Sequence, residues 1–393
     1  MTEIRGIAPL YLAGFTTAFG AHGVASVLGG ESDDIGLSLL GLGLALALYD
    51  VAEVVLKPLF GALSDRIGAK PVIVGGLAAF AAASLLAILD PTPLVLALVR
   101  LGQGAAAAAF SPASSSAVAR MAGAERLGRS FGRYGAWKSL GYVAGPLLGV
   151  LLVQAFGMAA LYLALGALAA AAAVWTVLAM PSLPVLPRTR STLSDLFRQT
   201  TERGFLLPTL SLAMTTAVLG VAVGFLPLLA SRLGMPPLAG AAAVAVLAVV
   251  STAIQPAVGR RHDAGRLSTR AGSTAGLALA AAALVLLAVV PHAVTLFAAA
   301  IAFGAMTGVV TPLAFAHLAA NTPAERMGRT MGSAELGREV GDAGGPLLVG
   351  ALASVWTLPA ALAVLAGASA LAAIGGWSGY REKPGTSTGV RRR

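Results

Sequence analysis

The chain alternates between long apolar stretches and short polar segments, and this alternation predicts membrane-spanning helices. Each apolar stretch is about twenty residues long or longer, which is the length that a helix needs to cross the hydrocarbon core of a bilayer. Polar or Pro/Gly-rich segments between the stretches predict loops. The pattern therefore predicts an all-α integral membrane protein with twelve transmembrane helices. Their expected ranges are 7–28, 35–62, 71–89, 94–116, 130–155, 159–180, 206–229, 239–258, 271–289, 294–318, 331–355 and 359–379.

The composition agrees with a membrane protein. Hydrophobic residues make up 57% of the 393 residues and charged residues only 11%, whereas soluble domains contain about 25% charged residues. Cysteine is absent, which excludes disulfides, thiolate nucleophiles and cysteine-based metal sites. The net charge of +10 would suggest a nucleic-acid partner for a soluble chain. In a membrane protein the excess of basic residues is instead explained by their placement in the loops on one side of the membrane. We therefore expect a lipid bilayer as partner and no nucleic acid.

Basic residues occur in every second loop, and their placement predicts the orientation of the chain. By the positive-inside rule the basic loops face the cytoplasm. Both termini join this side, because Arg5 stands near the start and the chain ends in three arginines. We therefore expect a multi-pass protein of the cell membrane with both termini cytoplasmic. The basic loop residues are Arg66, Lys70, Arg120, Arg126, Arg129, Arg188, Arg190, Arg198, Arg203, Arg260, Arg261, Arg266, Arg270, Arg326 and Arg329.

An internal repeat divides the chain into two related halves. "AERLGRSFG" at 124–132 matches "AERMGRTMG" at 324–332, and "GYVAGPLLG" at 141–149 matches "GDAGGPLLV" at 341–349, both at an offset of 200 residues. At offsets within two residues of this value, Gly61 and Asp65 correspond to Gly259 and Asp263. Two homologous six-helix bundles are expected, with a transport path between them near the membrane midplane. The expected divisions are a bundle at 1–180, a cytoplasmic linker at 181–205, a second bundle at 206–380 and a basic cytoplasmic tail at 381–393.

Three charged residues, Asp50, Glu53 and Lys57, interrupt the apolar stretch at 35–62. A charge at the bilayer centre costs about 2.5–3.5 kcal/mol on insertion scales, so all three should face the protein interior. Glu53 and Lys57 have the favoured order for an i,i+4 ion pair, which leaves Asp50 without a local partner. A carboxylate that alternates between an apolar cavity and water can take up and release a proton. Asp50 is therefore the first candidate proton carrier and Glu53 the second, while a structural cluster with Arg100 is the alternative.

The stretch at 331–355 contains a second charged group. Glu335, Glu339 and Asp342 are spaced by four and three residues, so they share one helix face, and Arg338 lies within reach of Glu335 and Asp342. By the repeat, Lys138 occupies the position of Arg338 in the first half. We expect these carboxylates to take part in proton coupling by exchanging basic partners as the halves move.

Other residues are candidates for coupling or for substrate binding. Arg100 has no basic equivalent in the second half, where Ala300 stands at its position; this favours a coupling role over a fixed salt bridge, which is the alternative. His22 can titrate near neutral pH, although a lone histidine is often only packed and hydrogen-bonded. The residues expected to bind substrate are His22, Lys138, Arg338, Phe19 and Trp137.

The sequence gives no indication of an enzyme or of a resident cofactor. It contains no Gly-x4-Gly-Lys-Ser/Thr motif for nucleotide binding and no convincing set of nucleophile, base and orienting residue. Met327 and Met331 lie at helical spacing at a loop boundary, where methionine usually serves packing and not metal binding. We therefore expect no metal and no cofactor, with the proton as coupling ion.

Three motifs resemble signatures of the major facilitator superfamily. "GALSDRIGAK" at 61–70 resembles Gly-x-x-x-Asp-Arg-x-Gly-Arg-Arg/Lys between the second and third helices, except that Ala69 replaces a basic residue. "RLGQG" at 100–104 resembles the fourth-helix signature Arg-x-x-Gln-Gly. The fifth helix follows Gly-x8-Gly-x3-Gly-Pro-x2-Gly, a pattern that the family associates with twelve-helix drug:proton antiporters. The residues that match this last pattern are Gly132, Gly141, Gly145, Pro146 and Gly149.

The resemblance implies a conformational gate at the cytoplasmic side. In such a gate Asp65 latches one conformation, with Arg66 and Arg129 as its charge partners; a plain ion pair in a loop is the alternative. In the fifth helix Gly141, Gly145 and Pro146 allow close approach of a neighbouring helix and a bend, which suits a helix that seals one side of a bundle interface.

Together these observations predict a monomeric proton-coupled transporter that works by alternating access. The expected activity is export of a small, partly apolar compound or drug in exchange for protons. One alternative is a proton symporter that imports a polar or anionic solute, with Arg100, Lys138 and Arg338 as binding groups. An alternative of another class is a non-transporting membrane receptor on the same scaffold.

Overall fold

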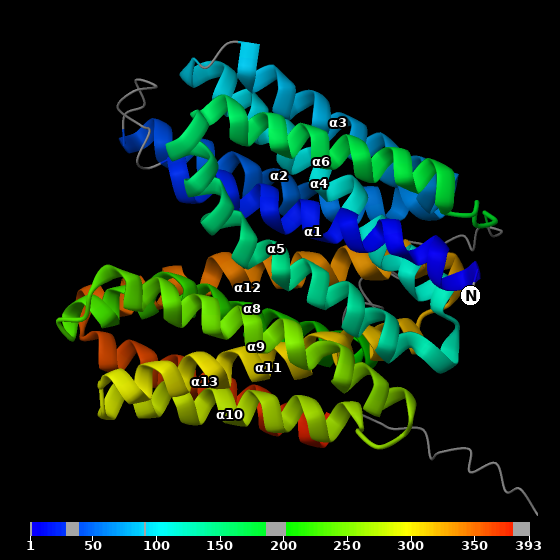
Figure 1. Cartoon of the computed structure of the whole chain (residues 1–393). Coiled ribbons are helices and arrows are strands. Elements are labelled where there is room, and N and C mark those ends of the chain that lie inside the picture. Colours follow the sequence, from blue (N-terminus) through cyan, green and yellow to red (C-terminus); the bar gives the residue numbers. More distant parts are fainter. Residues whose placement is uncertain (1, 29–38, 90–91, 186–201, 380–393) are drawn as a thin grey trace, which may run out of the picture.

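The computed structural model describes residues 2–28, 39–89, 92–185 and 202–379, and these form twelve long α-helices and two short 3₁₀ helices (Figure 1). The predicted all-α fold with twelve long helices is confirmed. The first half contains α1 (Thr2–Leu28), α2 (Leu39–Ile67), α3 (Ala69–Leu89), α4 (Pro93–Ala122), η1 (Ala124–Arg126), α5 (Leu127–Phe156) and α6 (Met158–Ala179). The second half contains α8 (Arg203–Arg232), α9 (Pro237–Asp263), α10 (Thr269–Val289), α11 (Ala293–Ala320), η2 (Ala324–Arg326), α12 (Met327–Val355) and α13 (Leu358–Gly379).

Nine of the described helices are long and apolar enough to cross a membrane on their own composition, and the remaining three are α1, α2 and α12. The last two carry the charged residues that the sequence places inside the membrane. Charged positions lower the hydropathy of a helix, so α2 and α12 depend on burial against other helices.

Local sequence explains several helix ends. Thr92 precedes α4 and its hydroxyl accepts a hydrogen bond from the backbone N–H of Val95, while Pro93 occupies the first helical position. The helix α2 continues to Ile67, five residues past its predicted end at 62. It stops at Gly68, whose φ of 96° lies in the left-handed region that glycine adopts without a steric penalty. Asp65 and Arg66 therefore lie on the last turn of α2 and not in a loop.

The helices pack into two bundles, α1 to α6 and α8 to α13, which lie side by side (Figure 1). One cluster of buried apolar side chains lies within the second bundle, and the other is centred on the first bundle and extends into α8, α11 and α12. The bundles meet mainly along two lines of contact, where α2 packs against α12 and α5 packs against α9. We call these the α2–α12 seam and the α5–α9 seam.

The described basic residues that flank both seams lie at one end of the molecule, and we call this end the basic end. Arg66 ends α2, Arg126 precedes α5, Arg260 lies in the last turn of α9, and Arg326 precedes α12. The end of α2 contacts η2, and the end of α9 contacts η1. The seams thus bring the end of a helix in one half to the start of a helix in the other.

Glycines allow the seams to close tightly near the basic end. A Cβ atom added to Gly61 would overlap the carbonyl oxygen of Gly328, and one added to Gly259 would overlap the carbonyl oxygen of Gly128. The backbones of the paired helices therefore approach so closely that only glycine fits at these positions.

Candidate functional site

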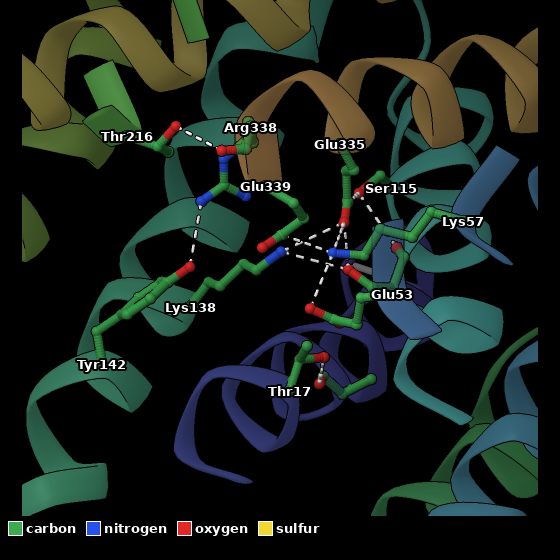
Figure 2. Close-up of polar contacts among 12 residues, drawn as sticks. Thr17, Glu53, Lys57, Ser115, Lys138, Tyr142, Thr216, Glu335, Arg338 and Glu339 are labelled. Carbon is green, nitrogen blue, oxygen red and sulfur yellow. Dashed lines mark hydrogen bonds and ion pairs between the residues drawn. The ribbon is translucent and has the colours of Figure 1, made fainter. Parts of the chain in front are cut away.

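A cluster of ionic side chains, all buried except the half-buried Glu339, lies where the two halves meet (Figure 2). We call it the charged cluster, and it consists of Glu53 and Lys57 on α2, Lys138 on α5, and Glu335, Arg338 and Glu339 on α12. The two lysines approach the carboxylates from helices of the first half (Figure 2). Three carboxylates and three cations make the fully ionised cluster neutral.

Lys57 is the hub of the cluster. Its side chain is fully buried, and its Nζ lies 2.5 Å from Oε1 of Glu339, 3.3 Å from Oε2 of Glu53 and 3.7 Å from Oε2 of Glu335. The predicted Glu53–Lys57 pair is therefore confirmed, and Lys57 also connects the two halves. The sequence indicated no role for Lys57 beyond this pair, although a lysine in the middle of an apolar stretch was a signal for one.

Glu335 is held by a second set of donors. The hydroxyls of Ser111 and Ser115 on α4 donate to its two oxygens at 2.5 and 2.6 Å, and Nζ of Lys138 lies 3.5 Å from Oε2. Its side chain is fully buried. A buried carboxylate with this many donors is well compensated as an ion. The two serines were missed as site residues, although Ser111-Pro112 corresponds to Thr311-Pro312 at the repeat offset of 200 residues.

Arg338 joins the cluster to α5 and α8. Its guanidinium donates to the hydroxyl of Tyr142 at 3.4 Å, and its backbone carbonyl accepts a hydrogen bond of 2.7 Å from the hydroxyl of Thr216 (Figure 2). Among the described residues no ion pair joins Arg338 to Glu335 or Asp342, which helical spacing had placed within its reach. Its guanidinium contacts Tyr142 instead, a residue that the spacing alone did not indicate.

A cavity of about 210 Å³ adjoins the charged cluster. It is bounded by parts of α1, α2, α4, α5 and α12, and lies on the side of the cluster away from the basic end, because Ala25 and Leu46 line it. Its polar or titratable lining residues are Thr17, His22, Asp50, Glu53, Arg100, Lys138, Tyr142, Glu339 and Asp342.

Asp50 and Asp342 differ from the other acidic residues of the cavity. No hydrogen bond or ion pair joins either carboxylate to another residue in the part of the chain that the structure describes. The prediction that Asp50 lacks a local partner is confirmed. Asp50 is exposed to the cavity and Asp342 is half-buried, so both can meet water or a ligand.

Arg100 lies at the wall of the cavity and points into the first bundle. It is almost completely buried, its guanidinium lies 4.3 Å from the ring centroid of Tyr49, and it is 3.4 Å from the side-chain oxygen of Gln103. Gln103 in turn donates to Ser84 at 2.9 Å. The Nε of Arg100 has no hydrogen-bond partner among the described residues. The contact with a tyrosine ring replaces the fixed salt bridge that was the alternative from sequence.

The structure separates the predicted substrate-binding residues into two groups. His22 lines the cavity, with its ring centroid 4.4 Å from that of Tyr142, and Lys138 lines it as well. Phe19 is buried and stacks on Phe15, while Trp137 is 44% exposed and meets the edge of the same phenylalanine. Phe19 and Trp137 are not among the residues that line the cavity.

Two aspartates close the seams at the basic end. The Asp65 carboxylate accepts hydrogen bonds of 2.7 and 2.9 Å from the backbone N–H groups of Gly328 and Arg329 at the start of α12. The Asp263 carboxylate accepts hydrogen bonds of 2.8 Å from Gly128 and 2.8 Å from Arg129 at the start of α5. Both use the unpaired N–H groups and the positive dipole end of a helix.

This arrangement corrects one expectation about Asp65. Its partner is the backbone of Arg329, whereas Arg129 binds Asp263 on the other seam. The reason is that Asp65 ends α2, which crosses to α12, while Arg129 begins α5. Burial raises the pKa of the Asp65 carboxyl, which lies beyond the apolar part of α2, to about 6, and the N–H groups of Arg329 and Gly328 oppose this effect.

The glycines of the predicted gate in α5 pack within the first half. A Cβ atom on Gly141 would lie 2.6 Å from the carbonyl oxygen of Phe15, and one on Gly145 would lie 2.9 Å from the backbone nitrogen of Gly23. Gly141 and Gly145, with Pro146 in the same helix, thus hold α5 against α1 and do not face the second half. Within the described ranges, no group of three or more histidine, aspartate or glutamate side chains is placed to hold a metal ion.

Two homologous bundles, two seams and a polar cavity between them define a membrane transporter fold. The model of the Major Facilitator Superfamily matches residues 10–293 and 264–392 of the chain. The chain therefore belongs to this family of multi-pass membrane transporters, whose members are not enzymes.

Similar curated proteins are named as multidrug resistance proteins or as a membrane transport protein. The multidrug resistance protein MdtH of Yersinia pestis is 28% identical over 313 residues, which cover 79% of this chain and 77% of that protein. The inner membrane transport protein YajR of Escherichia coli is 33% identical over 36% of this chain and 31% of its own length. A multidrug resistance protein B homolog of Mycobacterium tuberculosis is 37% identical over 28% of this chain and 20% of its own length.

Solved transporters share the fold. The human organic anion transporter MFSD10 has a TM-score of 0.79 at 19% identity, covering 96% of this chain and 100% of that chain. The transporter FucP in the outward conformation has a TM-score of 0.81 at 15% identity, covering 97% and 100%. At this level of identity the likeness concerns the fold alone.

Proposed function

We propose that the protein is a proton-coupled secondary transporter that works by alternating access and exports a small, partly apolar compound in exchange for protons. The proposal places it in the cytoplasmic membrane, with the basic end on the cytoplasmic side. One observation carries it. Asp50 and Asp342 face a cavity between the halves without a hydrogen bond or ion pair to another described residue.

The contrast between these aspartates and the charged cluster supports proton exchange. Glu335 has two hydroxyl donors and a lysine, and Glu339 has Lys57 at 2.5 Å. Such compensation favours the ionised form. A carboxylate without a donor loses little when it is protonated, and it regains its charge when the cavity fills with water. In this proposal Asp50 and Asp342 take up and release the coupling protons.

The charged cluster also offers a route from protonation to movement. Lys57 on α2 binds Glu339 on α12 across the α2–α12 seam. Protonation of an acidic neighbour changes the balance of charge around this ion pair and hence the strength of the seam. The similarity to multidrug resistance proteins, MdtH of Yersinia pestis among them, supports a drug-like substrate.

The test uses purified protein in liposomes loaded with a pH-sensitive dye. A panel of lipophilic cations, neutral dyes and organic anions is added outside, and proton movement is recorded with substrate movement. Antiport predicts that protons and substrate cross in opposite directions. Asp50→Asn and Asp342→Asn should abolish proton-driven transport, while Glu325→Gln, on the exposed helix η2, is the matched control. Unchanged proton-driven transport in both aspartate variants would contradict the proposal.

A second candidate is proton symport of a polar or anionic solute. Arg100 and Lys138 both line the cavity, and the Nε of Arg100 has no hydrogen-bond partner among the described residues. These cations could hold an anionic group. Movement of protons and an organic anion in the same direction would favour this candidate.

A further inference from the structure

The two seams carry side chains at equivalent positions, but their chemistry differs. The stretch from Glu53 to Asp65 on α2 reads Glu-x3-Lys-Pro-x2-Gly-x3-Asp, and the stretch from Ser251 to Asp263 on α9 reads Ser-x3-Gln-Pro-x2-Gly-x3-Asp. The offset is 198 residues throughout. Ser251 therefore corresponds to Glu53, and Gln255 corresponds to Lys57.

The helices that face these stretches correspond in the same way. Glu339 on α12 is equivalent to Ser139 on α5 at the repeat offset of 200 residues. The acidic and basic triad Glu53, Lys57 and Glu339 thus has a neutral counterpart in Ser251, Gln255 and Ser139.

The contacts of the two triads match. Lys57 reaches Glu339 across its seam and Glu53 along its own helix. The amide nitrogen of Gln255 donates to Ser139 across the α5–α9 seam at 2.7 Å and to Ser251 along its own helix at 3.1 Å. The hydroxyls of Ser139 and Ser251 lie 3.3 Å apart. Gln255 and Ser251 are fully buried.

The backbone around the neutral triad is packed as closely as that around the charged one. A Cβ atom on Gly132 would overlap the carbonyl oxygen of Gln255, and a Cβ atom on Gly332 would lie 2.6 Å from the carbonyl oxygen of Lys57. Both central residues precede a proline inside the helix. The two seams therefore have equivalent backbone packing, but the α2–α12 seam carries ionic side chains and the α5–α9 seam carries an amide and two hydroxyls.

We propose that Ser139, Ser251 and Gln255 form a clasp that holds the α5–α9 seam with a strength independent of protonation, so that proton binding acts selectively on the α2–α12 seam. Amides and serine hydroxyls do not titrate in the working pH range, whereas carboxylates do. The inference rests on the proposed alternating-access function. It adds that the clasp stabilises closure of the basic end by the same amount at every pH, whereas closure of the α2–α12 seam changes with proton binding.

The titratable surroundings of the two triads support this asymmetry. Around the charged triad lie His22 on α1, Asp50 on α2, Arg100 on α4, Lys138 on α5, and Glu335 and Asp342 on α12. Tyr49, Tyr142 and Arg338 complete this set. Farther along, Asp65 closes the same seam.

The clasp has fewer titratable neighbours. On α5, Lys138 adjoins Ser139, but its Nζ points to Ser111 and Glu335. Tyr134 and Tyr142 are also on α5, and His262 and Asp263 lie two turns away at the basic end of α9. Between their first and last turns, α8 and α11 contain no charged residue.

The test measures each seam separately in the full chain. Because the chain contains no cysteine, spin labels can be placed at exposed sites near the basic end, Glu125 with Ala264 for the α5–α9 seam and Ile67 with Glu325 for the α2–α12 seam. Distances are recorded by electron paramagnetic resonance in nanodiscs from pH 5 to 9. Any contribution of His262 and Asp263 is present in every variant and cancels in the difference from the unmodified clasp.

Removing the clasp and making it titratable should have different effects. Gln255→Leu, and Ser139→Ala as a milder variant, should increase the open population of the α5–α9 seam by a similar factor at every pH. Gln255→Glu, which keeps the shape of the side chain, should give this seam a new pH response. The α2–α12 seam should keep the pH midpoint of the unmodified protein in all three variants.

The outcomes separate this inference from the proposed function. A shift in the pH midpoint of the α2–α12 seam in Gln255→Leu and Ser139→Ala would overturn the clasp inference. The inference would also be overturned if the α5–α9 seam of the Gln255→Glu variant showed no new pH response. In both cases proton-driven transport in liposomes would still test the proposed function by itself. If neither seam moves in any variant, the inference and alternating access are both overturned.

Discussion

Replacing Lys57 by methionine should destabilise the folded protein more than any other single change in the charged cluster. Methionine fills a similar volume but removes the buried ammonium. Glu53 and Glu339 then lose the lysine with which each forms its ion pairs among the described residues. Breaking a buried ion pair by removing one partner costs about 3–5 kcal/mol, because the remaining charge stays buried without compensation. We expect a loss of this size in the free energy of unfolding.

Lys138→Met is the matched control. Glu335, its acidic partner at 3.5 Å, keeps two serine hydroxyls and Lys57 at 3.7 Å. The remaining donors compensate the carboxylate, so the loss should be about 1.5–3 kcal/mol, the size of one hydrogen bond to a charged group. The comparison holds the residue type constant and changes only how many donors the carboxylate has left.

The measurement is equilibrium unfolding in mixed micelles with increasing SDS, followed by tryptophan fluorescence. A second background, Glu53→Gln with Glu339→Gln, completes the cycle. If uncompensated carboxylates cause the loss, Lys57→Met in this background should cost less than about 1.5 kcal/mol, because no buried charge is left behind. Equal losses for Lys57→Met and Lys138→Met, or an equal loss of Lys57 in both backgrounds, would refute the reasoning.

Three further predictions concern the serines, the glycines and the aspartate at the basic end. Ser115→Ala should reduce the free energy of unfolding by about 1.5–3 kcal/mol, the value of a hydrogen bond to a charged group. A loss below about 0.5 kcal/mol in the same SDS titration would contradict this prediction. Gly259→Ala should hold the basic end of the α5–α9 seam open in distance measurements, because its Cβ would overlap the Gly128 carbonyl, whereas Gly75→Ala meets no neighbour within 4 Å and should have no effect. The pKa of about 6 for Asp65 in the closed seam lies above the ordinary aspartate value near 3.9, so closing takes up a proton. The contribution of Asp65 to closure is complete at pH values below the ordinary aspartate pKa and is lost as pH rises through about 6. Asp65→Asn should therefore remove this part of the pH dependence of the distance across the α2–α12 seam. An unchanged pH dependence would contradict the assignment.

The sequence by itself determined the architecture. Apolar stretches near the thickness of a bilayer predict the helices, since backbone groups in lipid must be hydrogen-bonded within a helix. The repeat at an offset of about 200 residues predicts two bundles, because homologous segments fold alike. The charges in the stretches at 35–62 and 331–355 predict an internal polar site, because such charges are too costly in contact with lipid.

Only the tertiary structure decided which residues meet. Helical spacing predicts the Glu53–Lys57 pair because both residues lie on one helix. It cannot predict that Lys57 reaches Glu339 or that Ser115 binds Glu335, because those contacts depend on how helices from different halves cross. The same limit explains why Asp65 was assigned Arg129 and binds the backbone of Arg329 instead. Periodicity fixes the face of a helix, and packing between helices fixes its partner.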